Sequence, residues 1–421
     1  MLQAAAIRVP KAARMRELLR DREFLAYFAA RQGAQLGYSI ETVAIGWQIY
    51  GLRHQPLDIG LVGLVLFVPQ LLLALPAGTL ADRFDRRIVC VACACGEVVA
   101  ELVFVGLVLT GSRSLPVNLA AVGLIGIAHT LGGPAERALL AGIVRSERFV
   151  RAQAMTTSVG EVVTIVGPAL GGVLIAVGVP VAFGAAAAAY ALAALAFSFL
   201  APRPTEEQAL EPGAAIAGLR FVLHHPVILG AISLDLFAVL FGGATALLPV
   251  YATQILHVGP IGFGALRSAP AVGAALVAAY LARHPIARRA GPLLLWCVAG
   301  FGAATIVFAV SHNLVLSLLA LAATGGFDIV SVVIRTTLVQ LDTPNAMRGR
   351  VSAIENIFIG ASYQLGAFES GVLAALVGTV ASVAIGGVAT LAVIALWAIL
   401  FPALRAYDRI GDGESASAPG S

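Results

Sequence analysis

The chain has 421 residues, of which 59% are apolar before its 45 glycines are counted, and only 12% are charged. No soluble core of this length could bury so much apolar surface, so the composition excludes a cytosolic enzyme, a nucleic-acid-binding domain, a secreted disulfide scaffold and a disordered chain. The net charge of +4 comes from basic residues at the ends of apolar segments, which is typical of membrane topology rather than of a nucleic-acid partner. The sequence therefore predicts an integral membrane protein.

Apolar runs long enough to cross a bilayer as helices recur twelve times along the chain. The runs cover residues 24–50, 57–81, 88–110, 116–143, 153–179, 180–200, 226–255, 261–283, 291–310, 313–342, 350–376 and 380–403. They are continuous, whereas outer-membrane strands are short and alternate apolar with polar residues. The sequence therefore predicts an all-α membrane protein with twelve transmembrane helices.

A stretch that carries Pro and Glu separates the sixth run from the seventh and divides the chain into six plus six. We therefore expect five parts. They are a cytoplasmic basic N-terminus (1–23), a first six-helix bundle (24–200), a cytoplasmic linker (201–225), a second six-helix bundle (226–403), and a cytoplasmic tail of small polar residues that predict disorder (404–421).

The basic residues orient these spans. With residue 1 in the cytoplasm, 21 of the 27 Lys and Arg residues fall in cytoplasmic segments, two (Arg53 and Arg113) fall in outer loops, and four fall within spans. Such an excess of basic residues on one side places both termini in the cytoplasm. The N-terminus lacks a small-residue cleavage site, so the first run is expected to remain as a helix. We expect a multi-pass protein of the bacterial inner membrane.

The two halves repeat at an offset of 199 residues. This offset pairs Arg151 with Arg350, Gly167 with Gly366, and His129 with Asp328. Two halves in the same orientation predict a pseudo-twofold axis along the membrane normal, an arrangement that in transporters places the substrate site between the halves.

The segment at the end of the second span has a distinctive spacing of small, acidic and basic residues. It contains Gly78, Asp82, Arg83, Arg86 and Arg87. Gly78 would permit close helix packing, and Asp82 could accept hydrogen bonds from a neighbouring helix N-terminus. An ordinary positive-inside loop explains the arginines but leaves the Gly-to-Asp spacing unexplained.

This spacing resembles the signature between helices two and three of the major facilitator superfamily, and the 6+6 layout agrees over nearly the whole chain. Shorter matches at 46–50, 234–237, 327–331 and 348–352 resemble the bacterial branch that includes the enterobactin exporter and the transmembrane secretion effector proteins. The resemblance implies the major facilitator fold, and it implies that Asp82 and Arg86 latch an inner gate.

The fifth span carries a proline among glycines, at Gly167, Pro168, Gly171 and Gly172. Proline removes one helix hydrogen bond and glycines allow close approach, so a tightly packed hinge is expected. A role in packing alone is the alternative. The segment also resembles part of the motif found in exporters and antiporters of this superfamily, which implies outward transport.

Ionisable residues concentrate in spans 1, 4, 7 and 10, which by resemblance to the family line the cavity. A charge within the bilayer costs about 2.5 kcal/mol or more, so such residues tend to face the bundle interior and mark pathways. The residues are Arg31, Glu41, His129, Glu136, Arg137, Asp235, Asp328 and Arg335. The last two lie seven residues apart, too far for close-lying side chains to bond directly, and Asp235 could bridge them.

On span one, Arg31, Gln35 and Tyr38 recur at helical spacing and form a polar stripe that continues to Glu41. We take Asp328, Asp235, Glu41 and His129 as candidates for proton coupling, and Arg31, Gln35, Tyr38 and Arg335 as candidates for the substrate cavity. Structural roles are the alternatives for Glu41, His129 and Asp328. Glu97 and Glu101 are expected to face another helix and receive no role. Glu161, Glu355 and Glu369 could each pair with more than one arginine, and the sequence does not choose between them.

The functional expectation is a secondary active exporter that moves a small amphipathic, siderophore-like or drug-like compound outward in exchange for protons. No Walker A motif occurs, so the chain is not expected to be an enzyme that hydrolyses ATP. The alternatives are a proton-coupled importer of the same fold and a non-transporting membrane sensor or assembly partner. We expect a monomer in contact with lipids, without cofactor, metal or nucleic acid; the four cysteines have no metal-site spacing.

Overall fold

A computed structural model describes residue 18 and residues 20–202, 214–286 and 288–408. Within these residues the chain is almost entirely helical. The long helices are α2 (Arg22–Arg53), α3 (Pro56–Arg83), α4 (Arg86–Leu109), α5 (Leu115–Ile143), α6 (Ser146–Val177), α7 (Val179–Ser198), α9 (Pro226–Phe241), α11 (Gly259–Leu281), α12 (Ala290–Val310), α13 (Leu314–Asp342), α14 (Asn345–Val377) and α15 (Thr379–Leu400). The expected all-α membrane fold is confirmed. Most of the expected N-terminus and tail lies outside the described residues.

Ten of the helical segments, with α9 to Ile255 taken as one, are long and apolar enough to cross a membrane. The helices α2 and α14 have the length but are more polar in sequence. Their polar residues are those that a helix facing the bundle interior can carry, because only lipid-facing surfaces must be apolar throughout. The twelve expected spans therefore correspond to ten strongly apolar segments and two polar ones.

Several helices begin at residues that suit a helix N-terminus. The Asp21 carboxylate caps α2 by accepting hydrogen bonds from the backbone N–H groups of Glu23 (3.1 Å) and Phe24 (3.3 Å). Asp85 caps α4 in the same way through the N–H of Arg87 (2.9 Å). Prolines stand in the first turn of α3 and α9, where no partner is needed for the missing N–H.

The seventh span is broken where α9 ends. After Gly242, the chain continues as a 3-10 turn η1 (Gly243–Leu247), the short α10 (Leu248–Val250) and a π-helical turn η2 (Tyr251–Ile255). A Cβ atom on Gly243 would lie 2.6 Å from the Gly366 carbonyl oxygen of α14. The glycine therefore lets α14 approach the break closely.

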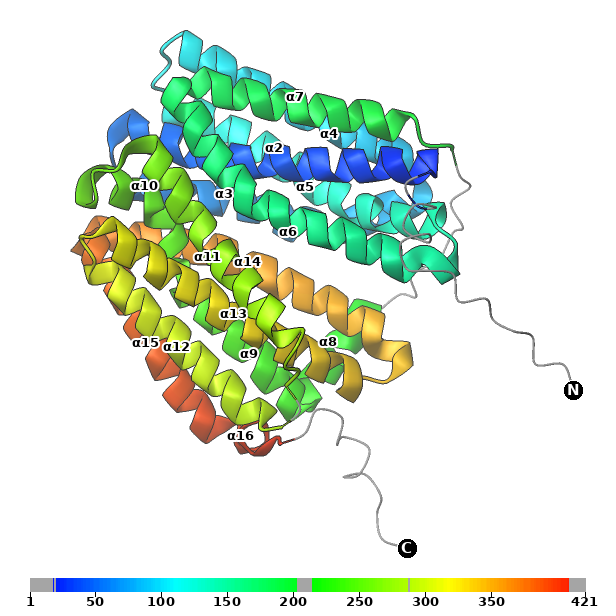
Figure 1. Ribbon diagram of the computed structural model, residues 1–421, viewed down its shortest axis with the longest axis vertical. Helices are drawn as coiled ribbons and strands as arrows, with labels where there is room; N and C mark the ends of the chain where they lie inside the picture. Colours follow the sequence, from blue (N-terminus) through cyan, green and yellow to red (C-terminus); the bar gives the residue numbers. More distant parts are fainter. Residues whose placement is uncertain (1–17, 19, 203–213, 287, 409–421) are drawn as a thin grey trace, which may run out of the picture.

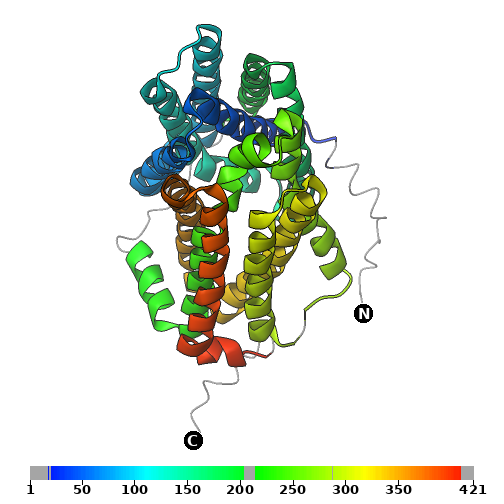
Figure 2. The same ribbon diagram turned by 90° about the vertical axis from the view of Figure 1, so that its left-hand side faces the viewer.

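The helices form two groups, α2–α7 and α9–α15, which Figures 1 and 2 show above and below one another. One hydrophobic core joins both groups and includes Ile49 and Phe104 of the first and Tyr251 and Phe308 of the second. A second core, containing Phe24 and Leu140, belongs to the first group alone, and two further cores, containing Leu294 and Val351, belong to the second. The halves thus share a core at the end remote from the termini and have separate cores at the near end.

The expected linker contains an element of its own. The helix α8 (Ala214–His224) precedes α9 and packs against the start of α14, where a Cβ on Gly218 would lie 3.0 Å from the Arg350 Cβ. The remainder of that linker, residues 203–213, lies outside the described residues.

The internal repeat appears in the packing. Gly172 of α6 lies against Gly264 of α11, and Gly371 of α14 lies against Gly60 of α3. These two contacts join the halves at symmetric places, because Gly172 and Gly371 are separated by the 199-residue offset. The contacts confirm the pseudo-twofold arrangement.

Candidate functional site: side chains that link the halves and an adjoining cavity

Five polar or aromatic side chains form a chain of interactions that crosses from one half to the other. The Tyr38 ring of α2 stacks on the His129 ring of α5 with their centroids 4.9 Å apart. Tyr38 also interacts electrostatically with Arg267 of α11. Tyr363 of α14 interacts with Arg267 and with Asp328 of α13. Although deep within the bundle, the side chains of His129 and Tyr363 are exposed, so they face an interior cavity.

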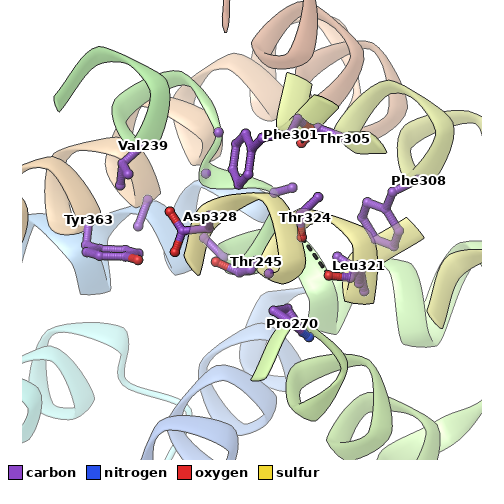
Figure 3. A pocket seen from close by; sticks show the side chains of 16 residues that line it. Val239, Thr245, Pro270, Phe301, Thr305, Phe308, Leu321, Thr324, Asp328 and Tyr363 are labelled. Atoms are coloured by element: carbon purple, nitrogen blue, oxygen red, sulfur yellow. Dashed lines mark hydrogen bonds between the residues drawn. The ribbon is translucent and has the colours of Figure 1, made fainter. Parts of the chain in front are cut away.

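A cavity of about 110 Å³ adjoins this chain on the side of the second half. Its wall consists of Asp328, Tyr363 and Thr245 together with apolar side chains such as Phe301 and Leu321. In Figure 3 the Tyr363 hydroxyl and the Asp328 carboxyl point toward one another. A mostly apolar wall with few polar groups is typical of sites for organic molecules, but such sites measure about 300–1,000 Å³, so this cavity could hold only part of one.

Among the described residues, neither a hydrogen bond nor an ion pair is recorded for the Asp328 carboxyl. A smaller cavity, of about 10 Å³, lies between Asp328 and Asp235. This volume is about that of one water molecule, which could bridge the two carboxyls. Asp328 is thus an acid without a cation, placed between the large cavity and a buried ionic cluster.

The ionic cluster is centred on Arg335 of α13, whose side chain is 3% exposed. One guanidinium nitrogen contacts Asp235 of α9, and Nε donates a hydrogen bond to Glu355 Oε1 of α14 at 3.0 Å. Arg335 therefore pairs with Asp235 and Glu355 and not with Asp328, and its side chain is too buried to line the cavity.

A second ion pair occupies the corresponding level of the first half. Arg31 of α2 contacts Glu136 of α5 at 2.8 Å. In this half the base stands on the first helix and the acid on the fourth, whereas in the second half Asp235 stands on the first helix and Arg335 on the fourth. The halves therefore carry complementary charges at this level.

The polar stripe of α2 divides between two environments. The amide of Gln35 donates a weak hydrogen bond to Thr164 Oγ1 of α6 at 3.5 Å, and the Tyr38 ring stacks on His129 of α5. Glu41 lies instead inside the first half, 1% exposed, and accepts a hydrogen bond from the Tyr190 hydroxyl of α7 at 2.8 Å. Glu41 is therefore not a cavity residue in this conformation.

The glycines of the expected hinge bring α6 close to two partners. A Cβ on Gly167 would collide with Ser39 of α2, and a Cβ on Gly172 would lie 2.6 Å from the Pro260 carbonyl oxygen of α11. Gly171 packs on Ile40 and Val43, and Pro168 continues the helix. The segment thus packs the first half internally and also closes the contact between halves at the end remote from the termini.

Among the described residues, the inner-gate motif makes two contacts within its own loop and one with the end of α7. Arg86 lies 3.9 Å from Asp82 and donates to the Ala81 carbonyl at 3.2 Å, and Arg87 donates to the Leu200 carbonyl at 2.8 Å. Arg83 is exposed. No atom lies within 4 Å of the position of a Cβ on Gly78, so the expected close helix approach at Gly78 is absent in this conformation.

Tyr363, which lines the cavity, and Arg267, which interacts with Tyr363, were not among the candidates from sequence. They lie on α14 and α11, the eleventh and eighth spans, whereas resemblance to the family pointed to spans 1, 4, 7 and 10. The available signal was the rarity of an arginine within a span. Arg267 donates to the Thr245 carbonyl at 3.4 Å, and no carboxylate pairs with it among the described residues.

Comparison with known proteins places the chain in a family. The sequence model described as transmembrane secretion effector matches residues 17–417. The enterobactin exporter EntS of Citrobacter koseri is 29% identical over 397 residues, which cover 91% of this chain and 93% of that protein. EntS of Shigella flexneri is 28% identical over 411 residues, 94% of this chain and 95% of that protein.

Solved structures share the fold at low identity. A mutant of the nucleoside transporter NupG superposes with a TM-score of 0.72 at 13% identity, over 90% of this chain and all of that one. A bacterial homologue of the human lysosomal transporter Spinster gives 0.65 at 13% identity, over 94% and 97%. Family model, relatives and fold agree: this chain is a membrane transporter that belongs to the transmembrane secretion effector family of the major facilitator superfamily.

Proposed function

We propose that this protein is a proton-coupled exporter of the bacterial inner membrane, which expels a small amphipathic compound by alternating access. Both termini lie in the cytoplasm in this proposal. The structure then represents the inward-facing state, because the halves share a core at the outer end and have separate cores at the inner end.

The observation that carries the proposal is the polar chain across the two halves. Tyr38 and His129 belong to one half, and Arg267, Asp328 and Tyr363 belong to the other. A molecule bound among these side chains touches both halves, so a rocking motion of one half against the other changes the side of the membrane to which the molecule is exposed.

The chemistry of the cavity supports the choice of substrate class. The rings of Phe301, Phe308 and Tyr363 in its wall offer stacking surfaces. Asp328 in the wall and Arg267, which interacts with Tyr363, offer one charge of each sign without a protein counter-ion among the described residues. An aromatic compound with polar substituents fits such a wall. The enterobactin exporters that the chain is similar to favour a siderophore-like compound and outward transport.

Asp328 is the proposed coupling acid. Desolvation makes its ionised form costly, and no cation offsets this cost among the described residues. Uptake of a proton from the outside would neutralise Asp328, and release to the cytoplasm would restore the charge. Asp235 is held by Arg335 and is therefore the less free of the two acids.

The test begins with a search for the compound. Strains that lack or overproduce the protein are screened for altered sensitivity to antibiotics, dyes and metal chelators. A compound found in this way is then supplied to inside-out vesicles. An exporter should accumulate it only when the vesicle interior is acidic. Accumulation in right-side-out vesicles would indicate an importer, and absence of movement in both would contradict transport of that compound.

A further inference from the structure

Three buried glutamates lie together inside the first half, apart from the central cavity. Glu41 of α2 is 1% exposed, and Glu97 and Glu101 of α4 are 4% and 0% exposed. All three interact electrostatically with one another. The elements that hold them also include α7, whose Tyr190 hydroxyl donates to Glu41 Oε2 at 2.8 Å.

The position of the three glutamates depends on close packing between α2 and α7. A Cβ on Gly37 would lie 3.0 Å from the Tyr190 ring, so only the glycine admits the ring at this depth. The ring in turn places its hydroxyl on Glu41, one helical turn further along α2. The three acids are therefore enclosed by tight contacts between α2, α4 and α7 rather than solvated.

The glutamates lack the donors that ionised carboxylates need. Within the described parts of the chain, no donor reaches either oxygen of Glu101 or the Oε2 atom of Glu97. Glu41 and Glu101 nevertheless lie within hydrogen-bonding reach of each other. Two carboxyl groups can share a hydrogen bond only if one of them carries a proton. The unpartnered oxygens thus point to a bound proton.

No cation among the described residues offsets the charge of the cluster. The other titratable groups facing it are Tyr38 of α2, Cys93 of α4 and Tyr190 of α7, with His129 of α5 behind Tyr38. Arg267 of α11 interacts with Tyr38, and Arg31 and Arg137 interact with His129, but none of the three interacts with a glutamate of the cluster. Three like charges without a counter-ion in this setting would be prohibitively costly.

We propose that Glu41, Glu97 and Glu101 form a second proton-binding site, which holds a shared proton between Glu41 and Glu101 in the conformation described. Tyr38 interacts with Glu41 and stacks on His129, so a proton that leaves Glu101 can reach the exposed His129 through Glu41 and Tyr38. Release would leave two facing carboxylates that repel each other, which would weaken the packing of α2 and α4 on α7. The inference that these glutamates bind a proton does not depend on transport. The inference that this proton is coupled to transport rests on the proposed function.

The test measures the proton directly. Infrared spectra of the purified protein in lipid nanodiscs report the C=O band of protonated carboxylic acids. At neutral pH the wild-type protein should show this band, Glu101→Gln should lose much of its intensity, and Glu41→Gln should shift what remains. The exposed Glu161 of α6 provides the control, and Glu161→Gln should leave the band unchanged.

Asp328→Asn separates this site from the cavity acid, because the band assigned to the cluster should persist in that variant. A wild-type spectrum without the band at neutral pH would overturn the proposal. So would an unchanged band in both Glu101→Gln and Glu41→Gln. Glutamine mimics the protonated acid in shape and charge, so both variants should fold, and unaltered thermal stability at low pH verifies this. The spectra do not depend on transport, so a failure to detect transport of any compound would contradict the proposed function but not the proton site.

Discussion

At the scale of single residues, the side chains that link the halves include a base and an acid, and neither has a counter-ion among the described residues. Arg267 and Asp328 both interact with Tyr363, yet no mutual interaction is found between them. The two charges are thus available to a bound molecule or to a proton. Buried charges of this kind are costly and mark function more often than stability.

Replacing Asp328 separates proton coupling from binding. Asp328→Asn should abolish efflux driven by a pH gradient, because the amide cannot release a proton, while exchange of substrate for substrate continues at near wild-type rate. Flux assays in vesicles, with and without a gradient, measure both. If the variant still concentrates substrate with normal pH dependence, Asp328 is not the coupling acid.

Removing Arg335 should destabilise the protein. Arg335→Gln leaves Asp235 and Glu355 as unpaired buried carboxylates, and breaking a buried pair in this way costs about 3–5 kcal/mol. Thermal unfolding in detergent should show a clearly lowered midpoint. The exposed Arg283 offers a control, because Arg283→Gln should change the midpoint little. Equal midpoints for the two variants would refute the structural role of the cluster.

Sequence reasoning identified many of these residues but not their environments. Asp235 was expected to be able to bridge Asp328 and Arg335, and the two acids do line the same small cavity, while Arg335 contacts Asp235 alone of the two. Glu97 and Glu101 received no role, since the periodicity of one helix does not tell which groups a neighbouring helix presents. Only the packing of α7, through Gly37 and Tyr190, brings Glu41 to them.

At the scale of helices, glycines determine where the halves touch. Gly172 and Gly371 occupy repeat-related positions on α6 and α14, and each lies against a glycine of the opposite half. Small residues let helix backbones approach closely within a membrane. The expected hinge segment is therefore also an interface segment, which its sequence alone could not distinguish.

Enlarging Gly172 should prevent closure of the outer end. In Gly172→Leu the side chain would collide with Pro260 and Gly264, which should favour a state open at that end. In a variant without the native cysteines, a cysteine at Thr245 reports access to the cavity from outside through a membrane-impermeant thiol reagent. Labelling should be faster in Gly172→Leu than in Gly184→Leu, where nothing lies within 4 Å. Equal rates would argue against an outer gate at Gly172.

The inner-gate motif is tested by removing its acid. In the part of the chain that the structure describes, Asp82 pairs with Arg86 alone, at 3.9 Å, which fits a latch that is open. Asp82→Asn should therefore reduce transport several-fold while substrate binding and expression stay near wild type. The flux is measured at matched protein levels. Undiminished flux would show that Asp82 is not part of the gate.

At the scale of the whole molecule, the fold followed from composition and charge. Twelve apolar runs, the 199-residue repeat and the distribution of arginines were enough to predict two six-helix groups. The break after Gly242 was beyond such reasoning, because η1 depends on the contact between Gly243 and Gly366 of a distant helix. The sequence also could not predict which conformational state the structure shows, because that state depends on which hydrophobic cores join the two halves.

The topology has its own test. Reporter proteins fused after residue 87 and after residue 408 should be cytoplasmic, and a reporter after Arg113 should be external, because basic residues concentrate on the first side. A reporter fused within residues 203–212, between the two halves, should also be cytoplasmic. An external location there would contradict the arrangement of six plus six spans.

The central claim is that outward movement of the compound is exchanged for inward movement of protons. Proteoliposomes that enclose a pH-sensitive dye and the compound identified by the screen are diluted into buffer without compound at equal pH. As the compound leaves, antiport should acidify the interior, and Asp328→Asn should remove this signal. An interior that becomes alkaline, or one whose pH stays constant while the compound leaves, would contradict proton-coupled export.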